Sequence, residues 1–231
     1  MEKKNTDERQ RAAGGRQQAA GGRRRPVSAY CCLLVRLLLP TAYRLLPHKY
    51  YLRAMGFKKL SMEELGRKSV DEFRTAEKSP VVVLLDNVRS MHNVGSVFRS
   101  ADAFLVHGIF LCGYTPRPPH RDIHKTALGA TETVHWEYEA EILPLLGRLK
   151  EDGYLLCAVE QAEGSTALGD LQLAAGQKIA LILGNEVEGV QDAVLEQSDL
   201  CVEIPQSGMK HSLNISVAAG IVLWEVTNKL Q

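Results

Sequence analysis

From residue 80 onward, short apolar runs alternate with segments of helical periodicity, and this alternation strongly constrains the fold. The runs are rich in Val, Ile and Leu, as strands are when helices cover both faces of their sheet. Strands that alternate with helices build a mostly parallel sheet. We therefore predict an α/β fold with helices on both faces and with strands at 81–86, 108–113, 133–138, 154–160, 178–184 and 200–205.

Two helices are expected to follow strands closely. Apolar residues recur at helical spacing over 93–105, for which Asn93 is the expected N-cap, and over 213–229, for which Ser212 is the expected N-cap. A loop rich in proline and basic residues runs to about residue 125. The other segments expected to be helical are 60–79 (one or two polar helices), 142–153 (closed by Gly153) and 189–198.

The segment IPQSGMKHSLNISVAAG, residues 204–220, leads from the last strand into the last helix. Pro205 lacks a ladder donor and Gly208 frees the backbone, so the chain must leave the sheet there. The backbone N–H groups of such a connection lie at the carboxyl edge of the sheet, where ligands bind in open α/β folds. Alone, the segment fits an ordinary strand-to-helix connection as well as a binding site.

A second polar segment, DNVRSMHNVGSVFRSADAF, spans residues 86–104. Gly95 permits close backbone approach in the first turn of the expected helix. Arg99 lies away from the apolar face, so its guanidinium is expected to project toward the strand ends, where it would suit a phosphate or a developing oxyanion. For a lone arginine, a solvated helix position is the simpler interpretation.

A third segment, LILGNEVEGV, spans residues 181–190, where Gly184 ends a buried strand and Glu186 follows in a tight turn. Polar side chains in so short a turn contact a ligand or one another. The turn is not G-x-G-x-x-G and holds no Walker lysine, so it gives no support to a dinucleotide or nucleotide-phosphate site.

The three segments together resemble a known family. N-x-G-x-x-x-R-S at 93–100, LILGNEVEGV at 181–190 and IPQSGMKHSLNISVAAGI at 204–221 are similar to the three motifs of the SpoU (TrmH) branch of the SPOUT methyltransferase superfamily. KTALGATE at 125–132 looks like its Lys-containing turn. The resemblance covers 80–231. It implies a C-terminal trefoil knot, a homodimer, and methyl transfer from S-adenosyl-L-methionine to a ribose 2′-hydroxyl of tRNA or rRNA.

The resemblance also assigns residues. It implies catalytic roles for Asn93, Arg99, Glu186, Ser212 and Asn214. Arginine side chains stay protonated in proteins, so we interpret Arg99 as an electrostatic and phosphate-orienting group. Whether Glu186 or a substrate phosphate accepts the hydroxyl proton stays open. The implied cofactor-binding residues, which act largely through backbone groups, are Leu183, Gly184, Ile204, Met209 and Leu213.

The charge of the chain is unevenly distributed. Residues 1–60 hold 14 of the 28 Lys and Arg residues with 3 acids, whereas residues 61–231 hold 14 basic and 24 acidic residues, a net charge of −10. RNA binding usually relies on phosphate attraction, so a local basic patch is needed. We expect one over 89–125, completed across a dimer; an ordinary solvated loop is the alternative. Its residues are Arg89, Arg117, Arg121 and Lys125.

The remaining features bound the class of protein. Five cysteines without C-x-x-C, and histidines without metal spacing, predict no metal and a reducing, cytoplasmic location. The apolar run 30–39 contains Arg36 and is far shorter than the roughly 20 residues of a membrane span. A signal or transit segment remains possible, but we favour a globular protein that begins near Met55. The expected organisation is a basic, non-globular extension at 1–54, a helical lead-in at 55–79 and the methyltransferase domain at 80–231.

Two other functions fit parts of the sequence. A non-catalytic RNA-binding protein could use the same fold, although the retained Arg99, Glu186, Ser212 and Asn214 speak against a decayed site. An α/β oxidoreductase with a nicotinamide cofactor is remote, because the glycine-rich fingerprint is missing after the first strand.

Overall fold

The structure is a computed structural model that describes residues 58–61, 63–66, 68–210 and 212–231. The chain divides into two compact units, Met1–Leu65 and Gly66–Gln231. The predictions for the basic extension and for the apolar run 30–39 lie outside the described residues. In the described part of the first unit, the exposed carboxylate of Glu64 pairs with Lys58 at 2.8 Å and accepts the backbone N–H of Ser61 at 2.7 Å.

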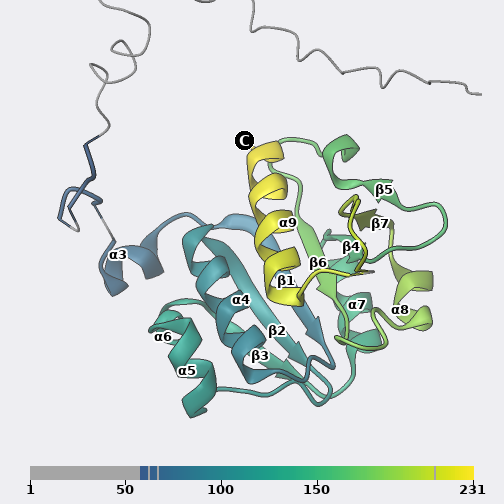
Figure 1. Cartoon of the computed structure of the whole chain (residues 1–231), viewed down its shortest axis with the longest axis horizontal. Helices are drawn as coiled ribbons and strands as arrows, with labels where there is room; N and C mark the ends of the chain where they lie inside the picture. Colours follow the sequence, from purple (N-terminus) through teal and green to yellow (C-terminus); the bar gives the residue numbers. More distant parts are fainter. Residues whose placement is uncertain (1–57, 62, 67, 211) are drawn as a thin grey trace, which may run out of the picture. The chain divides into compact units, whose positions relative to one another are not determined.

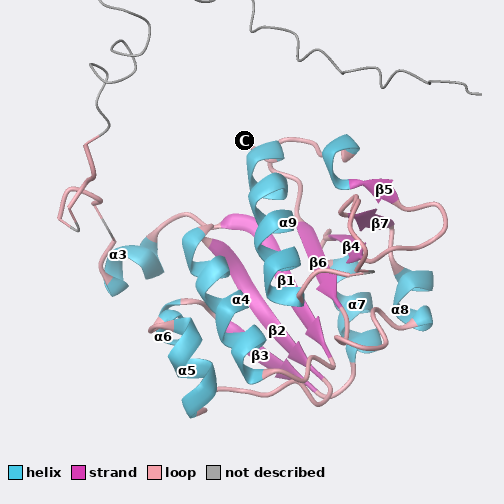
Figure 2. Ribbon diagram, in the orientation of Figure 1, coloured by secondary structure: helices cyan, strands magenta, loops and turns pink. Residues whose placement is uncertain are grey.

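The second unit is built on a parallel sheet, which Figure 2 shows in magenta. The sheet has seven strands in the order β3-β2-β1-β6-β4-β7-β5, and every paired neighbour is parallel. The predicted parallel α/β sheet is therefore confirmed. The strands are β1 (Ser79–Asp86), β2 (Val106–Cys112), β3 (Trp136–Glu139), β4 (Leu155–Val159), β5 (Thr166–Ala167), β6 (Ile179–Leu183) and β7 (Leu200–Glu203).

Helices cover both faces of this sheet, as Figure 1 shows. On β1, Val83 and Leu85 join the core under α4 (Met91–Ala103) and α9 (Ile215–Lys229). Val82 and Leu84 join the core under α7 (Ile142–Glu151) and α8 (Asp192–Gln197), because successive strand residues point to opposite faces. The helical segments are α3 (Val70–Thr75), α4 (Met91–Ala103), α5 (Arg121–Ala127), α6 (Ala130–Thr133), α7 (Ile142–Glu151), the 3₁₀ turn η2 (Leu168–Asp170), α8 (Asp192–Gln197) and α9 (Ile215–Lys229).

The predicted N-caps of the two site helices were wrong. The cap of α4 is Ser90, whose side chain accepts the backbone N–H of Asn93, and the cap of α9 is Asn214, whose side chain accepts the backbone N–H of Ser216. In each case two good capping residues lie within a few positions of each other, and apolar periodicity does not distinguish them. Asn93 is thereby free to bond with other loops, and Ser212 belongs to the loop before α9.

The loop predicted to run to residue 125 contains the start of α5. This helix packs closely on α4 at Gly95, where a Cβ atom would lie 2.1 Å from Thr126 Oγ1 and 2.3 Å from the carbonyl oxygen of Ile123. Gly95 does permit close backbone approach, but the backbone that approaches is that of α5. None of the helices in the described residues is both long and apolar enough to cross a membrane.

Candidate functional site

A pocket of about 610 Å³ lies at the carboxyl ends of β4, β6 and β7. Two connections form most of its wall: residues 184–191 between β6 and α8, and residues 204–214 between β7 and α9. Among the residues predicted to bind a cofactor, Leu183, Gly184, Ile204 and Leu213 line the pocket. Met209 is 86% exposed and is not part of the lining.

The turn after β6 is closed by glycine. A Cβ atom on Gly184 would lie 2.2 Å from the carbonyl carbon and oxygen of Gly189, so only glycine lets these two backbones meet. Gly189 has a φ of +73°, a left-handed conformation that favours glycine. The backbone N–H groups of Asn185 and Gly189 each donate to the other residue's carbonyl, at 3.0 and 2.9 Å. The G-N-E-x-E-G spacing therefore produces a rigid loop at the mouth of the pocket.

Asn185 is a site residue that the sequence interpretation did not single out. It is 9% exposed, and its Nδ2 donates to the carbonyl of Asn87 at 2.8 Å and to Tyr114 Oη at 2.7 Å. Its Oδ1 accepts the backbone N–H groups of Val187 and Glu188. The buried amide thus joins the β6 turn to the loops that follow β1 and β2. The only feature of the sequence that pointed to Asn185 was its position in the segment LILGNEVEGV.

Glu160, which follows β4, also escaped the sequence interpretation. Its Oε2 accepts the backbone N–H of Val190 at 3.0 Å, which holds the far end of the 184–191 connection. No motif surrounds Glu160, and its partner lies 30 residues away. Only the folded structure reveals it.

The pocket is strongly acidic. Among the described lining residues there is no Lys or Arg, and the five carboxylates are those of Glu160, Glu186, Glu188, Asp192 and Glu203. Several like charges around one hollow create a negative potential that attracts cations and repels phosphate. The pocket therefore suits a cationic ligand better than a nucleotide phosphate.

A chain of hydrogen bonds joins the three sequence motifs beside this pocket. The carboxylate of Glu186 accepts the backbone N–H groups of Arg89 at 2.8 Å and Ser90 at 3.0 Å, and the side-chain Nδ2 of Asn93 at 3.0 Å. Asn93 Oδ1 in turn accepts Nδ2 of Asn214 at 3.1 Å. Glu186, Ser212 and Asn214 line the pocket, and Asn93 reaches it through this chain.

The hydrogen bonds determine the charge of Glu186. Partial burial raises the pKa of its carboxyl group, but the hydrogen bonds from Arg89, Asn93 and Ser90 lower it, and the net result is a pKa below its ordinary value. The start of α4 also favours a negative charge, because the helix dipole is positive there. Glu186 is therefore ionised at neutral pH and is a weak proton acceptor.

Arg99 does not line the pocket of its own chain. It lies about two turns after the start of α4, roughly 12 Å along the helix axis, whereas the carboxyl ends of the strands lie at that start. The expectation that its guanidinium projects toward the strand ends was therefore wrong within one chain. Arg99 instead lines a second hollow, of about 500 Å³, together with Ser96, Ser100, Ala103, Phe104, Lys125 and Thr126.

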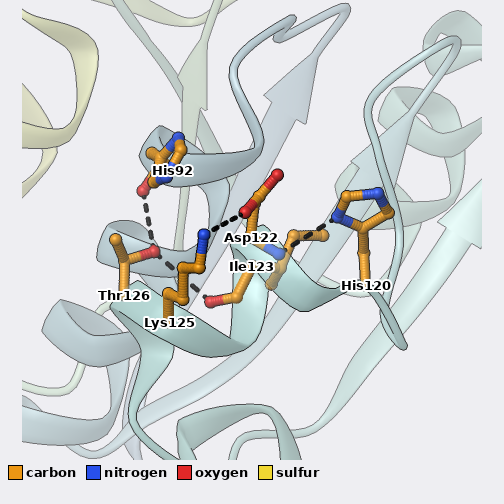
Figure 3. Close-up of polar contacts among 6 residues, drawn as sticks. All are labelled: His92, His120, Asp122, Ile123, Lys125 and Thr126. Carbon is orange, nitrogen blue, oxygen red and sulfur yellow. Dashed lines mark hydrogen bonds and ion pairs between the residues drawn. The ribbon is translucent and has the colours of Figure 1, made fainter.

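The predicted RNA-facing cations lie in different environments. Lys125 pairs with Asp122 at 2.7 Å on α5, as Figure 3 shows, so a carboxylate offsets its charge. Arg117 stacks on the ring of Tyr138, with its guanidinium carbon 3.9 Å from the ring centroid. The side chains of Arg89 and Arg121 are exposed.

Polar contacts fix the position of α5 beside these cations. The ring nitrogen Nδ1 of His120 accepts the backbone N–H of Asp122 at 3.2 Å and caps the helix. Thr126 Oγ1 donates to the carbonyl of His92 on α4 at 3.0 Å (Figure 3). Among the described residues, no group of three or more His, Cys, Asp and Glu side chains could hold a metal ion.

The described cysteines lie in strands, as their apolar surroundings predicted. Burial raises the pKa of the Cys112 and Cys157 thiols to about 12. Cys201 in β7 is half-buried and its pKa is also raised by burial. All three thiols are free. Thiols with such pKa values stay protonated at neutral pH and do not act as nucleophiles.

Comparison with known proteins identifies the family. The SpoU rRNA Methylase family matches residues 80–224. A 23S rRNA (guanosine-2′-O-)-methyltransferase RlmB of Vibrio vulnificus is 28% identical over 167 residues, which cover 72% of this chain and 66% of that protein.

Solved structures agree with this match. The TrmH/SpoU tRNA modifying enzyme of A. aeolicus superposes with a TM-score of 0.63 at 26% identity, over 69% of this chain and 80% of that one. The AdoMet-bound rRNA methyltransferase of Sinorhizobium meliloti gives a TM-score of 0.62 at 27% identity, over 69% and 60%. The chain spans 63–66% of the length of the first curated relatives that it matches. On the matched residues 80–224, this chain belongs to the SpoU (TrmH) family of RNA methyltransferases.

Proposed function

We propose that this chain transfers a methyl group from S-adenosyl-L-methionine to a ribose 2′-hydroxyl of tRNA or rRNA. The acidic pocket is the main support, because this donor has no phosphate and its sulfonium and ammonium groups outweigh its one carboxylate, which leaves a net positive charge. The Sinorhizobium meliloti relative is AdoMet-bound, and the Vibrio vulnificus relative is named as a guanosine-2′-O-methyltransferase. A nicotinamide dinucleotide, with two phosphates, would meet repulsion in the same pocket.

The lining residues fit the parts of the donor. Leu183, Ile204 and Leu213 offer an apolar wall for an adenine ring, and the turn at Gly184 presents backbone groups to polar edges. When bound, the donor supplies an electrophilic methyl group.

The polar residues position the substrate hydroxyl. Ser212 and Asn214 lie on the pocket wall, and Asn93 is held between Asn214 and Glu186. Because Glu186 is already engaged as an ionised acceptor, it holds Asn93 and α4 in place, and the hydroxyl proton leaves toward a substrate phosphate or solvent. Arg99 orients the RNA phosphate and stabilises charge that develops on the attacking oxygen.

We also propose a homodimer, which would supply Arg99 to the pocket. α9 exposes an apolar strip formed by Val217, Ile221 and Trp224, with exposed fractions of 50, 38 and 58%. The strip starts beside Leu213 at the pocket, and it ends where Trp224 contacts Phe104, which lines the Arg99 hollow. Two copies packed along this strip in antiparallel fashion would bring Arg99 of one copy to the pocket of the other.

The proposal also includes a C-terminal trefoil knot, the boundaries of the domain and a cytoplasmic location. The chain leaves β7, on the outer side of β4, and returns through 204–214 to α9, which packs on α4. This path, beside the 184–191 connection, is consistent with a C-terminal trefoil knot. The methyltransferase domain would be 80–231, preceded by a lead-in at 55–79 and an extension at 1–54. An RNA substrate and the free thiols of the described cysteines favour the cytoplasm, and the proposed reaction uses no metal.

The test uses the full chain, radiolabelled S-adenosylmethionine and total RNA from cells that lack the gene. We expect label in dinucleotides that resist alkali, because a 2′-O-methyl group blocks hydrolysis of the following phosphodiester. Label in alkali-sensitive nucleotides would mean base methylation and would refute the ribose assignment. RNA that is retained but never labelled would favour the non-catalytic alternative.

The Arg99→Ala variant separates binding from transfer. We expect it to bind S-adenosylmethionine with unchanged affinity and to lose turnover, because the proposed role of Arg99 is to contact the RNA phosphate and the attacking oxygen and not the donor. Undiminished turnover would remove Arg99 from the mechanism.

A further inference from the structure

A further hollow of the described surface lies outside the pocket proposed for the cofactor. It has a volume of about 910 Å³ and lies between the loop after β2 and the edge strand β3. Its wall is aromatic, proline-containing and cationic, formed by Gly113, Tyr114, Thr115, Pro116, Arg117, Pro118, Trp136 and Tyr138. The cofactor pocket, by contrast, is apolar and acidic.

We propose that this hollow is a stacking site for a nucleobase of the substrate RNA, one that is splayed out of its helix near the methylated nucleotide. Aromatic side chains bind unstacked bases through their faces, and an adjacent arginine adds attraction to the phosphate backbone. The inference rests on the proposed function and adds to it a specific contact for the RNA.

Two of the three aromatic rings are exposed enough to stack on a base, and the third is held against the core. Tyr114 is 60% exposed and Tyr138 is 38% exposed, so both present ring surface to solvent. Trp136 is half-buried and packs against the core, so it is fixed in place as a floor. A rigid aromatic floor lowers the entropy lost when a base is immobilised.

Arg117 supplies the positive charge. Its guanidinium carbon lies 3.9 Å from the centroid of the Tyr138 ring, which keeps the group flat beside the hollow. The two acids of β3 have partners of their own, since Glu137 contacts His135 at 2.9 Å and Glu139 pairs with Arg148. The positive charge of Arg117 is therefore available to a phosphate.

The hollow is also joined to the cofactor pocket. Tyr114 lines the hollow, and its Oη accepts a hydrogen bond at 2.7 Å from Asn185 Nδ2, which lines the pocket. Both sites lie at the carboxyl edge of the sheet, on either side of β1. A single RNA strand could therefore place one ribose at the pocket and a neighbouring base in the hollow.

Tryptophan fluorescence tests the inference. The chain has two tryptophans, so in the Trp224→Phe variant only Trp136 reports. We expect penta-adenylate to quench this fluorescence at saturation, and an abasic ribose-phosphate pentamer of equal charge to leave it unchanged. Equal quenching by both oligomers, or none by penta-adenylate, would overturn the proposal.

Paired variants add a functional readout. We expect Tyr138→Leu combined with Arg117→Gln to weaken penta-adenylate binding roughly tenfold and to raise the KM for RNA by a similar factor, because a stacked base is lost. Binding of S-adenosylmethionine should not change. The matched control is Tyr154→Leu with Lys178→Gln, another tyrosine–cation pair, with 5.4 Å between the ammonium and the ring centroid.

The two proposals can fail separately. If the chain methylates RNA but the Tyr138 and Arg117 variant keeps the wild-type KM, the stacking site is wrong and the methyltransferase function stands. If no RNA is methylated but penta-adenylate still quenches Trp136, the function is wrong and the hollow remains a base-binding site.

Discussion

A single carboxylate, that of Glu186, joins the start of α4 to the pocket at the carboxyl ends of β4, β6 and β7. It accepts the backbone N–H groups of Arg89 and Ser90, the two residues immediately before the first turn of α4. It also holds the side chain of Asn93. One residue thus combines a structural role in α4 with the alignment of a polar group at the pocket.

Glu186→Gln should lower the free energy of unfolding by about 1 kcal/mol at pH 7, a value reduced for solvent screening at this exposed site. Because folding lowers the pKa of Glu186 from its ordinary value of 4.5, its stabilisation is present above that value. It is lost as the pH falls through the lower, folded-state pKa. Urea unfolding of both proteins between pH 7 and pH 3 measures this difference.

The control for this change is Glu188→Gln, at an exposed glutamate in the same connection. It should leave the free energy of unfolding unchanged. A difference between wild type and Glu186→Gln that stays constant down to pH 3 would contradict the assigned role of the carboxylate.

Asn214 and Ser212 form a second matched pair. Asn214→Ala removes the N-cap of α9 and the bond to Asn93, so it should lower the free energy of unfolding by about 1 kcal/mol. Ser212→Ala removes an exposed hydroxyl that does not cap the helix and should change stability by less than about 0.5 kcal/mol. Chemical denaturation distinguishes the two, and equal effects would contradict the assignment of the cap.

At the scale of elements, the contact between α4 and α5 depends on one missing side chain. α5 lies so close to Gly95 that its own backbone occupies the position of a Cβ atom. The same helix pair carries Arg99 on α4 and Lys125 on α5, which line one hollow. A larger side chain at position 95 would therefore also move Arg99 and Lys125 relative to each other.

Gly95→Ala tests this packing. Alanine normally favours a helix interior, but here it forces two backbones apart, so we expect a loss of about 1–3 kcal/mol in the free energy of unfolding. Gly147→Ala is the control, because Gly147 lies in α7 with no atom within 4 Å of its Cβ position. It should gain about 0.5–1 kcal/mol. Thermal melts of both variants give the comparison, and a stabilised Gly95→Ala would refute the close contact.

The elements differ in how far their sequences predict them. β1 and β6 are buried on both faces, so each is a continuous apolar run that can be recognised directly. α5 is short and follows a proline-rich loop, and β5 has two residues, so neither leaves a periodic pattern. Helix starts were misplaced where two capping residues lie close together, as at Ser90 and Asn93.

The candidate site also combines features that the sequence predicts with contacts that it does not predict. The three motifs each follow a strand, and parallel strands end at one edge, so their meeting could be predicted from order alone. The bond from Asn185 to Asn87 joins residues 98 positions apart, and that from Glu160 to Val190 spans 30. Such contacts leave no local pattern. The distance of Arg99 from the strand ends depends on where α4 begins, and the sequence does not show the first residue of that helix clearly.

At the scale of the whole molecule, acidic and basic surfaces are separated. Residues 61–231 have a net charge of −10, and the acidic pocket contributes strongly to it. We therefore propose that RNA approaches over local cations such as Arg117, beside the aromatic hollow, while the acidic pocket takes the cationic donor. This separation explains how an acidic domain can combine a cationic cofactor with a polyanionic substrate.

The assembly of two copies is testable by light scattering. Each chain has a mass of 25.5 kDa, so we expect twice that mass for the wild type and a monomer for Trp224→Glu, which places a charge in the apolar strip of α9. Leu143→Glu is the control, at another exposed apolar position, on α7. A dimer that survives the change at Trp224 would place the interface elsewhere.

The most direct test of the account is calorimetric titration of the full chain with S-adenosylmethionine and, separately, with NAD. We expect one binding site per chain for the methyl donor and no heat for NAD. We also expect loss of donor binding in Gly184→Ala, where an added Cβ atom would open the turn that forms the pocket wall. No heat with the donor, or equal affinity for NAD, would contradict the central claim that the connections 184–191 and 204–214 form a pocket for a cationic methyl donor.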